Sequence, residues 1–197
     1  MKNTKHALRW IAGLGLALSL AGTAQAVEVG GIKFDDTVKV GGKELKLNGA
    51  GIRVRVVVKV YALALYLPEK KTTTAGVLES PGPRRFTLGM LREVTGDELG
   101  QAFVAGITAN TDKAERSKFV NQLAQLGETF VNIPQAKKGD IITVDWLPDT
   151  GTVMMLNGKP LGEPLKDVGF YNAMLKIWLG DKPVDSSLKP DILGAKS

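Results

Sequence analysis

The fold of this chain is decided by residues 47–67, which read LNGAGIRVRVVVKVYALALYL. We interpret the Gly-Ala-Gly sequence at 49–51 as a turn, and the residues from 52 to 67 that follow it contain neither Gly nor Pro. Val, Leu and Tyr dominate this run, which predicts β structure, either as one long strand or as two strands joined tightly.

Side chains alternate between the two faces of a strand, so parity assigns these residues to two faces. The even-numbered residues from Ile52 to Tyr66, Val60 among them, form an almost wholly apolar face. The other face begins with three cations and a phenol, Arg53, Arg55, Lys59 and Tyr61. For Arg55 and Lys59, an equal alternative is the solvated face of an edge strand.

The rest of the chain predicts strands and helices in separate groups. Strands are expected in a hairpin over 29–40 that turns at Asp35-Asp36, at 44–47, at 85–91, at 141–146 and at 151–156, where Asn157-Gly158 signals a tight hairpin. Helices are expected after a capping box at Thr95–Glu98, over 112–130, and from Asp167 to Gly180. Because strands do not alternate with helices, the pattern predicts an α+β fold, with helices packed on an antiparallel sheet.

The first 26 residues have the composition of a cleaved signal peptide. Lys2, Lys5 and Arg9 precede an apolar run at 11–21, and Ala24-Gln25-Ala26 supplies a small-x-small cleavage site. The apolar run is short for a membrane anchor, so we expect a mature domain over 27–197, in the periplasm and without a transmembrane anchor.

Removal of this leader takes away three cations and no acids, which lowers the formal net charge from +6 to +3. No basic stripe interleaved with aromatic residues is present, so nucleic acid is not an expected partner. The mature domain contains no Cys, and the one His of the chain lies in the leader. Ser-His-Asp and Cys-His catalysis are thereby excluded, as are zinc sites built on thiolate or imidazole. We expect no metal and no cofactor, and the sequence identifies no protein partner.

Several motifs in a fixed order resemble one known family. They are Gly-Ala-Gly-Ile-Arg at 49–53, Lys-Val-Tyr-Ala-Leu-Ala-Leu-Tyr-Leu at 59–67, Asn-Gly-Lys at 157–159, and a helix that ends Ile-Trp-Leu-Gly at 177–180. This pattern resembles the chalcone isomerase-like family, and its bacterial exported branch more than the plant flavonoid enzymes. The resemblance implies an open-faced β-sandwich, with helices covering one face of a large antiparallel sheet.

Arg53 is the first candidate for a ligand-binding residue. A guanidinium among apolar neighbours is costly unless an anion meets it, and its planar fork matches a carboxylate. The alternative is a partner within the protein, such as Glu93 or Asp145.

Tyr61 is the second candidate, because it shares the parity of Arg53. The resemblance implies that Arg53 faces a ligand cleft and that Tyr61 donates to a carboxylate, as in fatty-acid-binding relatives. A straight strand would separate the two residues by about 26 Å. A shared site therefore requires the chain to bend or reverse between Arg55 and Lys59.

On the helix side, the resemblance implies a tyrosine, a lysine and an asparagine in the enzymes, where this chain has Leu99, Ala102 and Gly106. These three residues would line an apolar pocket, although plain core packing is the more economical interpretation. We therefore expect no catalytic residues, and a cleft that binds an apolar ligand with an acidic head group, such as a fatty acid. The alternatives are an intramolecular lyase that relies on Arg53 alone and, less favoured, an envelope scaffold protein.

Overall fold

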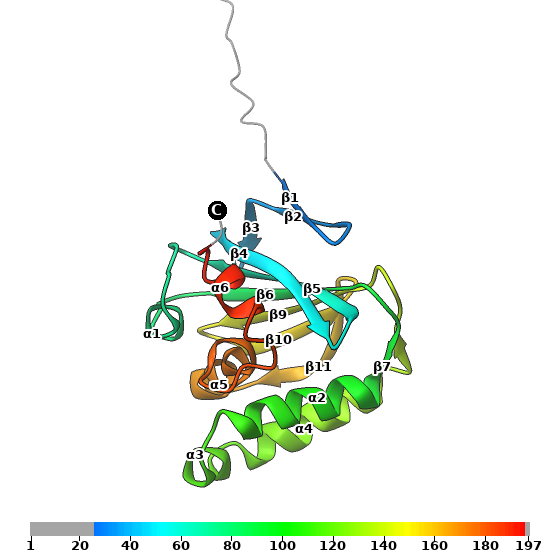
Figure 1. Cartoon of the computed structure of the whole chain (residues 1–197). Helices are drawn as coiled ribbons and strands as arrows, with labels where there is room; N and C mark the ends of the chain where they lie inside the picture. Colours follow the sequence, from blue (N-terminus) through cyan, green and yellow to red (C-terminus); the bar gives the residue numbers. More distant parts are fainter. Residues whose placement is uncertain (1–25, 196–197) are drawn as a thin grey trace, which may run out of the picture.

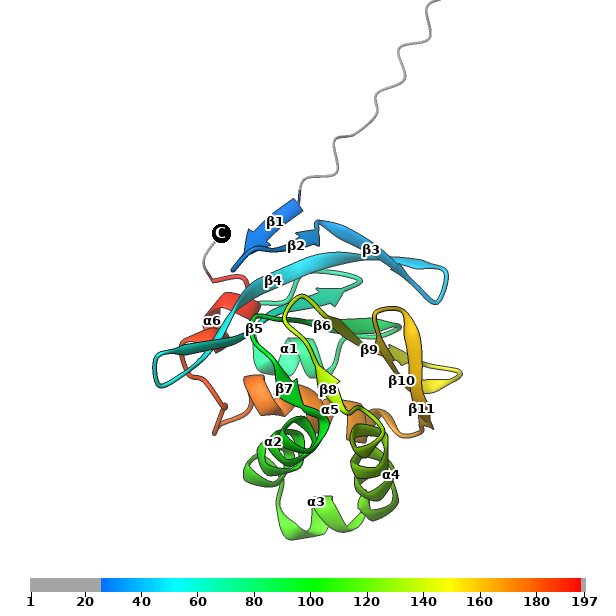
Figure 2. The ribbon, with the colours of Figure 1, turned by 90° about the vertical axis from the view of Figure 1, so that its right-hand side faces the viewer.

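Two long strands, β4 (Lys43–Arg55) and β5 (Val58–Leu67), form a hairpin whose turn lies at Val56-Val57. The computed structural model, which describes residues 26–195, thus contains two tightly joined strands and not one straight strand. In Figure 2 the turn of this hairpin lies at the left, where it projects beyond the remaining elements.

The hairpin belongs to a seven-stranded antiparallel sheet with the order β11-β10-β9-β6-β5-β4-β3. The other strands of this sheet are β3 (Thr37–Val40), β6 (Arg84–Met90), β9 (Ile141–Leu147), β10 (Gly151–Leu156) and β11 (Lys159–Leu165). Two small two-stranded sheets are formed by β1 (Ala26–Val29) with β2 (Ile32–Asp35), and by β7 (Val94–Thr95) with β8 (Gln135–Ala136).

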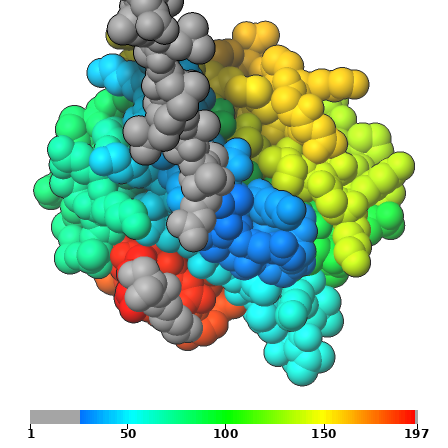
Figure 3. Space-filling model, turned by 90° about the horizontal axis from the view of Figure 1, so that it is seen from above, coloured from blue at the N-terminus to red at the C-terminus, as the bar shows by residue number. Residues whose placement is uncertain are grey.

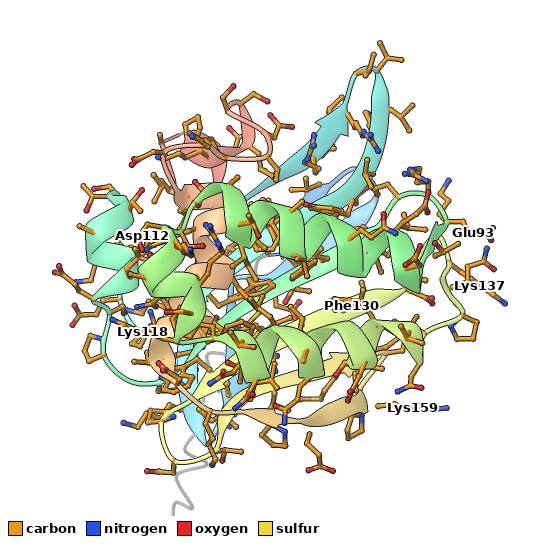
Figure 4. The ribbon with its side chains drawn as sticks, turned by 90° about the horizontal axis from the view of Figure 1, so that it is seen from below. Glu93, Asp112, Lys118, Phe130, Lys137 and Lys159 are labelled. Carbon is orange, nitrogen blue, oxygen red and sulfur yellow. The ribbon has the colours of Figure 1, made fainter. Side chains whose placement is uncertain are left out.

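The larger helices lie on one face of the sheet and the β1–β2 hairpin lies on the other (Figure 1). The helices are α1 (Thr74–Leu78), α2 (Gly96–Ala109), α3 (Lys113–Ser117), α4 (Val120–Val131), α5 (Val168–Leu179) and α6 (Leu188–Ile192). In Figure 4, α2 and α4 lie side by side, with Phe130 in the seam between them. The α+β fold with helices on one face of an antiparallel sheet is therefore confirmed.

Each face of the sheet has its own hydrophobic core. Leu63, Leu65 and Leu67 of β5 pack toward the helices, against the fully buried Trp178 of α5. Ala62 and Ala64 point the other way and join the smaller core beneath the β1–β2 hairpin. The alternation expected from parity thus holds along the inner half of β5.

Near the turn the parity prediction is wrong for Val60, which packs toward the helices although its number is even. The cause is a β-bulge: Arg53 pairs with Tyr61, whereas Val54 pairs with Lys59, so Val60 has no partner in the register. A bulge places one extra residue on a strand and re-aims the side chains beside it.

The expected hairpin with a turn at Asp35-Asp36 is also wrong. β2 pairs with β1 through Gly30-Gly31, and β3 pairs with β4 through Gly41-Gly42. All four glycines have positive φ, which suits tight turns at these two places.

The expected turn at 49–51 lies instead inside β4, which runs unbroken from Lys43. These glycines serve close packing against α6. A Cβ on Gly49 would collide with the carbonyl oxygen of Asp191, and one on Gly51 would lie 2.7 Å from the Leu188 side chain. The sequence analysis did not predict α6.

The three predicted helical regions are helical, and one of them is divided. Thr95 and Glu98 form the predicted capping box, and Asp167 caps α5 through Gly169 N–H. The region 112–130, expected as one helix, is divided into α3 and α4 around Lys118 and Phe119. Within the described residues, no helix is long and apolar enough to cross a membrane. The predicted leader lies outside the described residues except for Ala26.

Candidate functional site

A cleft of about 690 Å³ opens between the β4–β5 hairpin, α2 and the end of α5. Its floor is the turn half of the hairpin, and its walls come from the helices. The side chains that the sequence analysis selected all line it: Arg53, Tyr61, Leu99, Ala102 and Gly106. The volume lies within the usual range of small-molecule sites in proteins.

Arg53 and Tyr61 lie directly opposite each other on neighbouring strands, since they are partners in the β4–β5 register. Reversal of the chain at Val56-Val57 removes the separation that a straight strand would impose. Opposite residues of an antiparallel pair have Cβ atoms about 5 Å apart, so both polar ends can reach one carboxylate.

Arg53 has a partner within the protein, but it is neither Glu93 nor Asp145. Its Nη1 lies 3.5 Å from Oδ2 of Asp185, in the segment after α5, and also donates to the carbonyl oxygen of Val54. The guanidinium is also within hydrogen-bonding reach of the Tyr61 side chain, so the two polar groups lie together at the cleft.

Asp185 is held chiefly by groups other than Arg53. Its Oδ2 accepts from Val54 N–H at 3.0 Å, and its Oδ1 accepts from the amide and the hydroxyl of Ser187 at 3.0 and 2.7 Å. Burial alone would raise the pKa of Asp185, but these hydrogen bonds and the charge of Arg53 lower it below its usual value. Asp185 therefore stays ionised and keeps the guanidinium beside the cleft.

The hydroxyl of Tyr61 accepts a hydrogen bond of 2.8 Å from Nε1 of Trp178, and the two rings meet edge to face. Burial raises the pKa of Tyr61 to about 12, although the Trp178 hydrogen bond and the Arg53 charge lower it in part. The phenol is consequently neutral at physiological pH. With Trp178 fixed as its donor, Tyr61 retains its own hydrogen for donation to an anion.

The predicted wall residues come from one face of α2. Leu99 and Gly106 are buried, whereas Ala102 between them is exposed. A side chain on Gly106 would meet Ile177 of α5, because an added Cβ would lie 2.8 Å from Cγ2 of that residue. Gly106 therefore serves the close contact of two helices as well as the cleft. Core packing and cleft lining, weighed above as alternatives, are both present on this face.

The cleft contains functional side chains that the sequence analysis did not select. Trp178 donates to the phenol of Tyr61 and orients it. The cationic lining is larger than expected, because Arg55, Arg92 and Lys182 join Arg53, while Glu98 is the one acid in the lining. Arg55 could have been selected from its common parity with Arg53. Arg92 and Lys182 carry no such signal, since only the tertiary fold brings them to the cleft.

The arrangement is an apolar cleft with Arg53 and Tyr61 on its strand side. Two further cations lie at opposite ends of α2, Arg92 just before the helix and Lys182 beside its C-cap residue Asn110. The apolar side chains of the lining include Val60, Val94, Leu99, Phe103 and Ile177. Cations beside an apolar lining of this kind are chemically suited to an anionic group that carries an apolar tail.

Comparisons with known proteins identify the family and the fold. A family model described as chalcone isomerase-like matches residues 26–194, and the chain belongs to this family. No curated protein sequence matches this one.

Among solved structures, the fold is similar to that of a fatty-acid binding protein from Arabidopsis thaliana, with a TM-score of 0.69 at 15% identity. The similarity covers 87% of this chain and 97% of that chain, so it shows a shared fold over almost the whole plant protein.

Proposed function

We propose that this protein binds a fatty acid, or a similar apolar molecule with an acidic head group, in the cleft between the β4–β5 hairpin and the helices. The observation that carries the proposal is the pairing of Arg53 with Tyr61 across two strands, beside the apolar lining of the cleft. The family and the fatty-acid binding protein of similar fold support it.

The head group would take two kinds of hydrogen bond. The guanidinium of Arg53 would donate to the carboxylate, and the Tyr61 hydroxyl beside it would donate to the same group. Charge-assisted hydrogen bonds are stronger than neutral ones, and Arg55, Arg92 and Lys182 add a favourable potential around the anion.

The proposal does not include catalysis. Leu99, Ala102 and Gly106 offer the cleft no proton donor or acceptor, and positioned acids and oriented donors account for much of ordinary enzymatic rate enhancement. An intramolecular lyase that relied on Arg53 would lack that assistance.

We further propose that the chain is exported, with residues 1–26 removed on the way. N-terminal sequencing of the protein from a periplasmic extract should find Val27 first. Retention of Met1 on that form would contradict cleavage.

The binding proposal is tested by native mass spectrometry of the protein purified from its own cells, followed by solvent extraction. We expect an adduct that is released by solvent and identified as a fatty acid. Protein stripped of lipid should then bind added hexadecanoic acid. If no adduct is found and the stripped protein fails to bind the added acid, the proposal is wrong.

A further inference from the structure

The turn of the β4–β5 hairpin carries the most exposed apolar side chains of the described residues. Val56 and Val57 are 93% and 84% exposed, and Val58 beside them is 48% exposed. Other exposed valines, such as Val120 and Val131, occur singly. In Figure 3 this cyan segment protrudes from the molecular surface, so the three valines sit on a projection that the rest of the protein does not cover.

The backbone at this turn is unfavourable for the residue it contains. Val56 has a φ of +59°, in the left-handed region that a β-branched side chain rarely adopts. Two-residue hairpin turns with this backbone normally use Gly, Asn or Asp there. Since the folded protein gains no contact from Val56, the choice of valine points to a role outside the fold.

Cations flank the valines on both strands. Arg55 precedes Val56 and Lys59 follows Val58, and both side chains are exposed. Neither forms an ion pair with an acid within residues 26–195. Farther from the turn, Arg53 lines the cleft together with Arg92 and Lys182. The projection therefore has an apolar tip, formed by residues 56–58, and a collar of positive charge, formed by Arg55 and Lys59 on either side of it.

An apolar tip with a cationic collar matches the interface of an anionic bilayer. Short apolar segments enter the boundary between head groups and acyl chains, while Lys and Arg remain among the lipid phosphates. Each cation near an anionic surface strengthens binding about fivefold, and salt screens this contribution. The alternative is a protein partner with an acidic groove that fits the tip, and nothing in the described residues indicates such a partner.

We propose that the hairpin tip, Arg55–Lys59, docks this protein on anionic lipid membranes. Because the same hairpin forms the floor of the cleft, docking brings the cleft to the lipid surface. The inference rests on the exposure, strain and charge of the tip and does not require the proposed function. If both are correct, the ligand passes between bilayer and cleft without crossing bulk water.

Flotation with unilamellar vesicles tests this proposal. The protein is used without residues 1–26, because that apolar stretch would itself bind lipid, and residues 26–195 have their own cores. We expect binding to vesicles of equal parts phosphatidylcholine and phosphatidylglycerol, little binding to pure phosphatidylcholine, and release by high salt.

Two variants separate the contributions of the tip. Val56→Gly/Val57→Ser removes the apolar side chains and places Gly at the positive φ, so the hairpin should fold at least as well. Its affinity for the anionic vesicles should fall about tenfold, whereas its fatty-acid binding should persist. Arg55→Gln/Lys59→Gln should reduce vesicle affinity on the order of tenfold.

Matched controls lie away from the hairpin. Val120→Ser/Val131→Ser removes two exposed valines of α4, and Lys137→Gln/Lys138→Gln removes two exposed cations near β8. Both should bind vesicles like the unaltered protein. Thermal unfolding verifies the fold of every variant. If Val56→Gly/Val57→Ser unfolds the hairpin, the single variant Val57→Ser is used in its place to test vesicle binding.

The proposal is overturned if the unaltered protein does not bind anionic vesicles. It is also overturned if the tip variants bind these vesicles as tightly as the unaltered protein. It is also overturned if Val56→Gly/Val57→Ser converts an oligomer to a monomer without affecting vesicle binding. The tip would then join a second copy of the chain.

Discussion

Two arginine–aspartate pairs lie on opposite faces of the sheet, and they are built differently. Arg85 of β6 meets Asp145 of β9 with two hydrogen bonds of 2.6 Å, from Nε and Nη2. Arg53 meets Asp185 at 3.5 Å through Nη1. Both arginine side chains are 18% exposed, so burial does not distinguish the pairs.

The two pairs differ in the hydrogen-bond donors that each aspartate has. Asp145 is 4% exposed, and its hydrogen bonds within residues 26–195 come from Arg85 alone. Asp185 receives hydrogen bonds from Val54 and Ser187 regardless of Arg53. Arg85 is thus needed by a buried carboxylate of the fold, whereas Arg53 lies at a cleft, beside a carboxylate that has other donors.

Replacement of Arg85 should have the largest effect on stability. In Arg85→Gln the carboxylate of Asp145 stays buried without its cation, which should lower the free energy of unfolding by about 3 kcal/mol. Urea denaturation measures this loss. Arg53→Gln is the matched control and should lose less than about 1 kcal/mol, because Asp185 keeps its other donors. Equal losses in the two variants would mean that both pairs serve the fold.

Filling the cleft should lower the affinity for every ligand by a similar factor. Ala102 lines the cleft and is exposed, so Ala102→Phe adds a ring without disturbing the core. We expect hexadecanoic acid and hexadecanol each to lose about tenfold in affinity, or roughly 1.4 kcal/mol. Isothermal titration compares the two ligands. An unchanged affinity for both would place the tail outside the α2 wall.

Removal of the Tyr61 hydroxyl should have two moderate effects. Tyr61→Phe removes one ligand donor and leaves Nε1 of the buried Trp178 without its acceptor. Acid affinity should fall about fivefold and the free energy of unfolding by about 1 kcal/mol. A loss of stability with full acid binding would restrict Tyr61 to holding Trp178.

The smallest effect concerns pH. The pKa of Asp185 is lowered in the folded protein, so its ionised form stabilises the fold above the unfolded-state pKa of about 3.8. This contribution should be complete at neutral pH and disappear as the pH falls through the folded-state pKa. The difference in unfolding free energy between the unaltered protein and Asp185→Asn should therefore shrink below about pH 4. A difference that grows on acidification would contradict the direction of this shift.

Local sequence patterns predicted the elements that depend on local interactions. The Thr95–Glu98 capping box and the run from Arg53 to Leu67 were recognisable because neighbouring residues determine caps and alternation. The partners of β2 and β3 were not predictable in this way, because strand pairing depends on where two glycine turns direct the chain.

In the candidate site, too, local patterns were predictable from the sequence and contacts between distant segments were not. Parity placed Arg53 and Tyr61 on one face, and the family resemblance supplied the α2 residues. The bulge at Val60 and the Arg53–Asp185 contact arise from packing between distant segments, and residue 185 lies far from residue 53 in the chain. Gly49 and Gly51 were misinterpreted for the same reason, since only the packed α6 explains them.

The central claim is that Arg53 serves a ligand carboxylate and not the fold. The most direct measurement is the affinity of the unaltered protein and of Arg53→Gln for hexadecanoic acid and for hexadecanol, at neutral pH. The account predicts that the variant folds normally, loses about tenfold or more in affinity for the acid, and binds the alcohol as before. Equal losses for acid and alcohol, or no loss for either, would contradict it.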